Sequence, residues 1–266
     1  SAKNPKEAGS ITRAGSLTRG EVSGAAVTGA ERAGDLAAGD DVGASSAGDP
    51  VKKILAEIHK LQTTQPQARS REEFVEKATA TMNRVIELSE KVVTANPEPA
   101  DRDEARMAAM QAIAVLAQVD PKRPGLVEKA DTLAEEILTD LPEGETAAMA
   151  SFLRVVAHML VEGEQAMDDP AVTKRHFGMA KELAEKFPDF SRANQLLYQI
   201  SQNAQTSGQY DTAKEALKLL ADRESDSQMG KIISAKLRLL EAIGNPPEIA
   251  GPTLEGTDMN IADLKG

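Results

Sequence analysis

LAEKF, at residues 183–187, is the last of three similar segments in this chain. LSEKV at 88–92 and LAEEI at 133–137 precede it, and in each segment a leucine is followed by a small residue and a glutamate, with a proline a few residues downstream. A recurring small side chain lets two helices approach closely, and a proline ends a helix. The recurrence, at a spacing of 45 to 50 residues, therefore predicts stacked pairs of helices.

Apolar residues recur at three- and four-residue intervals over most of the chain, which is the period of an amphipathic helix. Residues that commonly start helices, such as Asp49, Ser70 and Ser227, stand directly before periodic runs. The pattern predicts an all-α fold of about nine helices with short polar joints. We expect these helices at about 50–62, 70–96, 101–118, 124–140, 145–162, 169–187, 191–208, 211–223 and 227–243.

The last helical unit is similar to a tetratricopeptide repeat. The large, small, turn-glycine and packing positions of that repeat correspond here to Leu197, Ile200, Ser201, Ala204, Gly208, Tyr210, Ala213 and Leu217. The other units diverge, and their spacing is longer than the roughly 34 residues of that repeat. The resemblance implies a right-handed solenoid of stacked antiparallel helical hairpins, and an irregular helical bundle is the alternative.

Composition divides the chain into three regions, at 1–49, 50–243 and 244–266. The first is rich in Gly, Ala, Ser and Thr and shows no sustained apolar period. Such a segment buries too little apolar surface to offset the entropy of ordering it, so we expect a disordered arm there. The second region holds the predicted helices.

The third region changes its pattern after Ile243. Several Gly and Pro residues forbid further helix, and Glu255-Gly256 lies between Leu254 and the alternating Met259 and Ile261. This arrangement is typical of a tight β-hairpin. A hairpin of this length is marginally stable by itself in water, so we expect another part of the protein to cover its apolar face.

The segment IGNPPEIAGPTLEGTDMNIADLKG, at 243–266, is similar to the opening of domains in the thioredoxin-like redoxin family, which includes bacterial thiol-disulfide oxidoreductases. The matching positions are Ile243, Gly244, Pro246, Leu254, Gly256, Ile261, Leu264, Lys265 and Gly266. Pro247-Glu248-Ile249 departs from the Pro-x-Phe more usual in that family. The resemblance implies a thioredoxin-like domain that begins at 244–266 and carries its Cys-x-x-Cys motif beyond Gly266. It also implies an exported location, periplasmic or in the cell envelope, with a cytoplasmic location as the alternative.

Composition argues against several classes of site and partner. The sequence has no cysteine, so these residues form no disulfide, thiolate metal site or redox thiol. The formal net charge of −11 repels nucleic-acid phosphates and anionic lipid, and no basic stripe offsets it. No stretch reaches the roughly 18 consecutive apolar residues of a membrane-spanning helix. We therefore expect neither a nucleic-acid partner nor membrane insertion.

The titratable residues show no pattern typical of catalysis or of metal binding. His59, His158 and His176 fall on three separate predicted helices without an i, i+4 partner. The acidic clusters around Asp101 and Asp169 lie at expected helix starts, where carboxylates favour the helix dipole, and they lack the glycine and distal glutamate of a calcium loop. The sequence thus predicts no catalytic residue, no cofactor and no metal.

One predicted helix offers a candidate peptide groove, made of Gln195, Tyr198, Gln202 and Gln205. These residues stand where tetratricopeptide-like repeats line a concave surface, and amide side chains there bind an extended peptide backbone. A solvated helix face explains them equally well. The unusually apolar helix around Met110 also has two interpretations, as an adaptable partner groove or as a central core helix.

The interpretation that joins these observations is a non-catalytic helical scaffold within a larger thioredoxin-like thiol-disulfide oxidoreductase. Its partners would be the thioredoxin-like domain of the same protein and, through the candidate groove, a peptide or protein. A stand-alone module that binds peptides or proteins is the alternative. An enzyme with an active-site cleft between helices is a third hypothesis.

Overall fold

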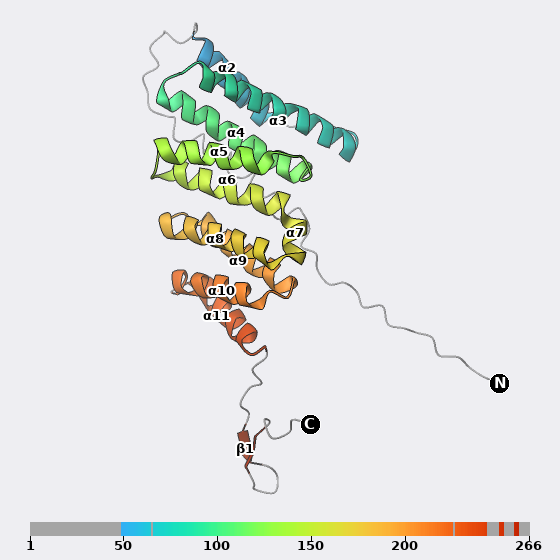
Figure 1. Ribbon diagram of the computed structural model, residues 1–266, viewed down its shortest axis with the longest axis vertical. Coiled ribbons are helices and arrows are strands. Elements are labelled where there is room, and N and C mark those ends of the chain that lie inside the picture. Colours follow the sequence, from blue (N-terminus) through green and yellow to red (C-terminus); the bar gives the residue numbers. More distant parts are fainter. Residues whose placement is uncertain (1–48, 65, 226, 244–249, 253–257, 261–266) are drawn as a thin grey trace, which may run out of the picture. The chain divides into compact units, whose positions relative to one another are not determined.

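The structure is a computed structural model that describes residues 49–64, 66–225, 227–243, 250–252 and 258–260 (Figure 1). The arm expected at 1–49 lies outside these residues, apart from Asp49. The described part contains the helices α2 (Pro50–Thr63), α3 (Arg71–Thr94), α4 (Pro99–Val119), α5 (Leu126–Asp140), α6 (Glu145–Val161), α7 (Gly163–Asp168), α8 (Pro170–Lys186), α9 (Arg192–Thr206), α10 (Tyr210–Arg223) and α11 (Gln228–Glu241), and the strands β1 (Ala250–Pro252) and β2 (Asp258–Asn260).

The predicted all-α fold is confirmed, with one more helix in the described residues than expected. The additional helix is α7, a six-residue segment between the predicted helices α6 and α8. The start of α4 also differs, because the helix begins at Pro99 rather than at Asp101. Proline fits this first position since it has no backbone N–H to leave unpaired.

Several helices start where a side chain caps the first turn. The Asp49 carboxylate accepts a hydrogen bond from Val51 N at 2.8 Å, and the Ser70 hydroxyl accepts one from Glu73 N at 3.1 Å. Ser227 caps α11 in the same way. These bonds satisfy backbone donors that have no partner within the helix, so they fix where each helix begins.

Each long helix packs mainly against its neighbours along the chain (Figure 1). Consecutive helices contact one another, and further contacts join α2 to α4, α4 to α6 and α8 to α10. The recurring small residues lie at these contacts: Ser89, Ala134 and Ala184 are all buried. The sequence repeat therefore marks positions at which a small side chain is buried among the packed helices, as close helix contact requires.

The apolar helix α4 is a core helix. It contacts α2, α3, α5 and α6, and Met110 is fully buried. Of the two interpretations of this helix, the central core position is the one that the structure supports.

The hairpin of α9 and α10 carries the residues that resemble a tetratricopeptide repeat. Ser201, Ala204 and Ala213 are buried where the two helices meet. Gly208 connects them with a positive φ of 75°, a conformation that glycine adopts without steric cost. Tyr210, by contrast, is exposed. The hairpin packing is thus present, while the right-handed tetratricopeptide-like type of the whole stack stays a prediction.

The two short strands lie within the predicted third region. β1 and β2 pair antiparallel, with Ala250 opposite Asn260 and Pro252 opposite Asp258. The expected turn at Glu255-Gly256 lies outside the described residues. Among the described helices, none is both long and apolar enough to cross a membrane.

Candidate functional site

The four residues of the predicted peptide groove share one face of α9, but they differ in their surroundings. Gln195 and Gln205 are exposed, and Gln202 is half-buried. Tyr198 contacts α11: its hydroxyl forms a hydrogen bond with the Lys236 ammonium, which also lies 4.7 Å from the centre of the tyrosine ring. Tyr198 therefore helps to hold α11 in place, and a peptide-binding function of this face stays a prediction.

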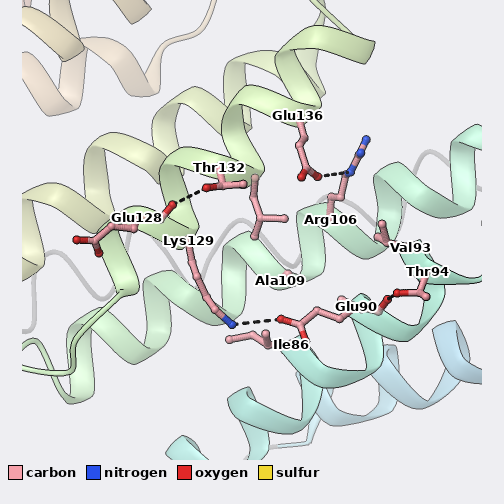
Figure 2. Close-up of a pocket in the computed structure, with 12 residues that line it drawn as sticks. Ile86, Glu90, Val93, Thr94, Arg106, Ala109, Glu128, Lys129, Thr132 and Glu136 are labelled. Atoms are coloured by element: carbon pink, nitrogen blue, oxygen red, sulfur yellow. Dashed lines mark hydrogen bonds and ion pairs between the residues drawn. The ribbon is translucent and has the colours of Figure 1, made fainter.

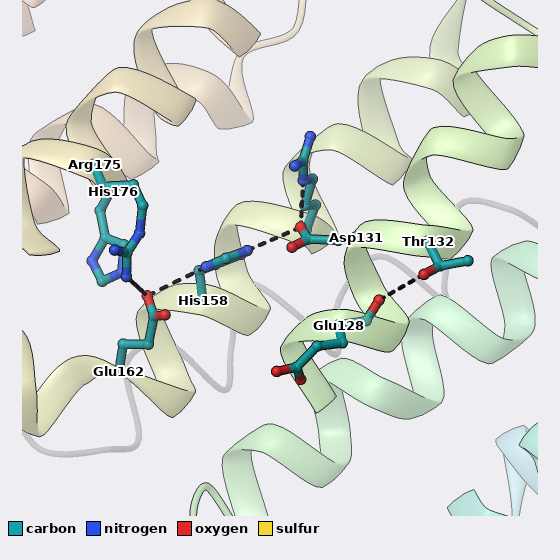
Figure 3. Close-up of polar contacts among 8 residues, drawn as sticks. Glu128, Asp131, Thr132, His158, Glu162, Arg175 and His176 are labelled. Atoms are coloured by element: carbon teal, nitrogen blue, oxygen red, sulfur yellow. Dashed lines mark hydrogen bonds and ion pairs between the residues drawn. The ribbon is translucent and has the colours of Figure 1, made fainter. Parts of the chain in front are cut away.

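A polar cluster at the end of α6 brings together side chains that lie far apart in the sequence (Figure 3). Its centre is Glu162, the residue that follows α6. One oxygen of this carboxylate, Oε2, lies 3.3 Å from His158 Nδ1, 2.8 Å from His176 Nε2 and 2.7 Å from a guanidinium nitrogen of Arg175. His158 lies one turn earlier on α6, whereas Arg175 and His176 come from α8.

The cluster continues on the other side of the His158 ring. His158 Nε2 lies 3.0 Å from Asp131 Oδ1 on α5, and the same oxygen accepts a hydrogen bond of 2.6 Å from Arg154. Figure 3 shows His158 between the two carboxylates of Asp131 and Glu162. An ionised carboxylate only accepts hydrogen bonds. His158 can therefore donate to Asp131 and to Glu162 at the same time only in the form of the ring that carries a proton on each nitrogen.

The cluster sets the charge of two groups. Burial acts to raise the pKa of Glu162, but hydrogen bonds from Arg175, His176 and His158 outweigh it and lower that pKa to about 2. Burial lowers the pKa of His176 below its usual 6.5, against the opposing effect of Glu162. At neutral pH Glu162 is therefore ionised, and His176 favours its uncharged form.

The expectation that the three histidines do not converge is wrong for His158 and His176. His59 does lie apart from them, on α2, where it pairs with Glu104 at 3.2 Å. The statement that no histidine has an i, i+4 partner is also wrong for His158, because Glu162 stands four residues after it and shares its helix face. The approach of His176 depends on the packing of α8 against α6, which no local pattern reveals.

The acidic residues at the start of α4 form ion pairs instead of capping the helix. Asp101 binds the Lys52 ammonium of α2. Arg106 Nη1 lies 3.6 Å from Asp103 and 2.6 Å from Asp140 of α5. Asp101 does lie in the first turn of α4, as expected, but the helix begins earlier and the carboxylate connects α4 to α2.

A pocket of about 400 Å³ opens between α3, α4 and α5 (Figure 2). Ile86, Val93, Ala109 and Leu133 supply its apolar wall. Two ion pairs border it, from Lys129 to Glu90 at 3.2 Å and from Arg106 to Glu136 at 3.0 Å. The buried hydroxyl of Ser89 also lines the pocket and has no hydrogen-bond partner within the described part of the chain.

The last helix, α11, and the turn after it expose an apolar stripe, which we define as Met229, Ile232, Leu239 and Ile243. Their exposed fractions are 51%, 47%, 71% and 46%. The spacing of three and seven residues places the first three along one side of the helix, and Ile243 follows two residues after its end. Ile233 and Leu240 are buried instead, and α11 packs on α10. Large apolar side chains exposed together on one side of a helix are typical of an interaction site.

Comparison of the whole chain with protein-family models, with curated proteins and with solved structures finds no match in any of the three.

Proposed function

We propose that the helical region is a non-catalytic scaffold of a larger thioredoxin-like thiol-disulfide oxidoreductase, and that the apolar stripe of α11 is the surface on which the thioredoxin-like domain docks. The stripe is the observation that carries this proposal. In a stack of helices each apolar face is covered by the next helix, and the outer face of the last one needs another cover. A docked domain supplies that cover.

The domain that docks on the stripe is expected to belong to the same protein, because the chain runs directly from the stripe into the redoxin-like segment. Ile243 is both the end of the stripe and the first residue of the redoxin-like segment. Eight residues, 242–249, separate the end of α11 from the start of β1. Even fully extended, they span less than about 30 Å. The pairing of β1 with β2 agrees with the two short strands that the resemblance implies.

Tethering raises the effective concentration of the docked domain, so a modest apolar surface suffices to hold it. The scaffold would then fix the orientation of the redox domain towards its partners. Because many fusions of a helical region to a thioredoxin-like domain work outside the cytoplasm, the proposal includes an exported location. No chemistry is assigned to the helical region itself.

The first test is to read the coding sequence after the codon for Gly266. We expect an apolar strand followed by a Cys-x-x-Cys motif. A stop codon at that point would exclude a fused redox domain.

The second test uses the full-length protein and the double substitution Ile232→Ser with Leu239→Ser. Hydrogen exchange along α11 should become faster and protease cleavage within 244–249 more rapid, because the docked domain separates. The matched control is Lys231→Ser with Arg238→Ser, which changes two exposed polar residues of the same helix. Equal behaviour of the two double variants would rule out docking on the stripe.

The pocket between α3, α4 and α5 favours a second candidate function, a peptide-binding module. We infer that its ligand is a peptide with one large apolar side chain next to a lysine or arginine. The apolar wall accepts the large apolar side chain of the peptide. Glu128 also lines the pocket, and no ion pair of its side chain is seen among the described residues. Its carboxylate therefore attracts the lysine or arginine of the peptide. The unpartnered Ser89 hydroxyl is available to a backbone group of the peptide.

This candidate is tested with fluorescent nonapeptides that contain Phe or Leu beside Lys, measured by anisotropy. Ala109→Leu fills the pocket and should weaken binding at least about tenfold, equivalent to ~1.4 kcal/mol. Ala80→Leu, on the exposed side of α3, is the control. Loss of affinity in both variants, or in neither, would contradict binding in the pocket.

A further inference from the structure

We propose that His158, Glu162 and His176 form a binding site for a zinc ion, with a water molecule as the fourth ligand. This site is independent of the proposed docking function. The structure brings one ligand atom from each residue to within 4.8 Å of the other two. Two histidines and one glutamate are a ligand set that Zn²⁺ uses in proteins, where three protein ligands leave one position for water.

The distances between the ligand atoms are close to those of a tetrahedral site. Zinc bonds of ~2.0–2.1 Å place neighbouring ligand atoms about 3.3–3.4 Å apart. His158 Nδ1 already lies 3.3 Å from Glu162 Oε2, and His176 Nε2 lies 2.8 Å from the same oxygen. The ligand atoms of His158 and His176 lie within 4.8 Å of one another. Tetrahedral binding therefore requires the His176 ring to move away from Glu162 while the two histidines stay on the same side of the ion.

The surroundings of His158 match a zinc-bound histidine. Metal-binding histidines commonly donate their second N–H to a carboxylate, which fixes the orientation of the ring. His158 Nε2 faces Asp131 at 3.0 Å, and Arg154 holds that carboxylate from the opposite side. This arrangement directs His158 Nδ1 towards Glu162. Zinc would replace the proton on Nδ1 and leave the proton on Nε2 in place.

The fold supplies a fixed framework for the three ligands. His158 lies on the last turn of α6, Glu162 follows that helix directly, and His176 is buried on α8. The bound ion would thus join α6 to α8 across the short helix α7.

Arg175 competes with the metal, because its guanidinium occupies the same oxygen of Glu162 at 2.7 Å. Its side chain is 48% exposed, so it can turn into solvent when an ion binds. Water can solvate the displaced guanidinium, and zinc forms bonds to three protein ligands at once. Removing Arg175 should therefore strengthen metal binding, because the substitution removes the competing guanidinium and keeps all three ligands.

The test is a calorimetric titration of Zn²⁺ into the chelator-treated protein, together with the visible spectrum of Co²⁺ in its place. We expect one equivalent of zinc, a higher melting temperature and the absorption bands of tetrahedral cobalt. His176→Gln should abolish stoichiometric binding, and Arg175→Gln should tighten it. Asp131→Asn should weaken it about 10–100-fold by releasing the His158 ring. His59→Gln, a histidine outside the cluster, is the matched control and should bind as the parent does.

The absence of stoichiometric binding in both the parent protein and Arg175→Gln would overturn the proposal, whatever the stability of the other variants. Binding that survives His176→Gln but fails in His59→Gln would also overturn it, because the ion would then lie at the surface. A cobalt spectrum of octahedral type would contradict the tetrahedral arrangement. Circular dichroism of His176→Gln distinguishes loss of the site from loss of the fold; if that variant unfolds, the Arg175→Gln and Asp131→Asn affinities decide.

Discussion

Gly230, in the first turn of α11, allows a close contact that no other residue permits. A Cβ atom there would lie 1.9 Å from the carbonyl oxygen of Glu224, which belongs to the turn before the helix. Gly178, on the exposed side of α8, is the opposite case, since a Cβ would meet nothing within 4 Å. We expect Gly230→Ala to lower the free energy of unfolding by about 1–3 kcal/mol. Gly178→Ala should raise it by ~0.5–1 kcal/mol, because alanine is a better helix former. Urea denaturation measures both, and a stable Gly230→Ala protein would contradict the packing of α11 on its preceding turn.

Asp140 links stability to acidity at the end of α5. A hydrogen bond from Arg106 lowers its pKa below 3.8, burial opposes this effect, and the charges of Arg102 and Arg106 add to it. The folded protein therefore binds fewer protons at this site than the unfolded chain does. The stabilisation is present above pH 3.8 and is lost as the pH falls below that value. Asp140→Asn should thus be destabilised relative to the parent at pH 7, and this difference should shrink as the pH falls below 3.8, as measured by urea midpoints. A difference that is constant across this range would show that Asp140 acts through shape alone.

Single residues also show which features could be predicted. Asp49, Ser70 and Ser227 cap helices through bonds to residues two or three positions away, so a local pattern suffices to find them. Asp101 was expected at the start of a helix, but its binding to Lys52, which lies 49 residues earlier, has no local signal. The histidine cluster has the same origin, because His176 reaches Glu162 only through the packing of two helices. Contacts between distant residues are set by the tertiary fold and leave no short-range signal.

At the scale of the helices, the small residues recurring in the sequence correctly mark where helices touch. Ala213 of α10 is completely buried against α9. Ala213→Leu adds three carbon atoms at a contact without space for them, so we expect a loss of about 1–3 kcal/mol of stability. Thermal unfolding followed by circular dichroism provides the measurement. Ala80→Leu is the matched control, because Ala80 is exposed on α3 and should tolerate the change. Equal melting temperatures for the two variants would mean that α9 and α10 do not pack through this face.

The helix that was not predicted, α7, depends on contacts from outside itself. Its sequence, GEQAMD, has only six residues and no apolar period. Two side chains bind the Ala166 carbonyl within it: the Thr173 hydroxyl at 2.8 Å and the Gln209 amide at 2.9 Å. Since Gln209 lies 43 residues away, at the start of α10, the helix becomes evident only when α8 and α10 are in place. Short helices without their own apolar stripe are therefore the elements that sequence patterns miss.

Over the whole helical region, contacts between neighbouring helices imply that stability is local. Ile58 of α2 is fully buried, and α2 packs mainly on α3 and α4. Ile58→Ala should cost about 2–5 kcal/mol through loss of apolar burial and a residual cavity. In a stack where each helix pair depends on its neighbours, the loss of stability is confined to the end of the stack that carries the substitution. Amide hydrogen exchange should therefore accelerate in α2, α3 and α4 and stay unchanged in α9, α10 and α11. Leu217→Ala, at a buried position of α10, is the reciprocal variant and should affect α9 to α11 instead. If either substitution accelerates exchange equally in all helices, the region unfolds as one cooperative unit, and the near-neighbour description of its stability is wrong.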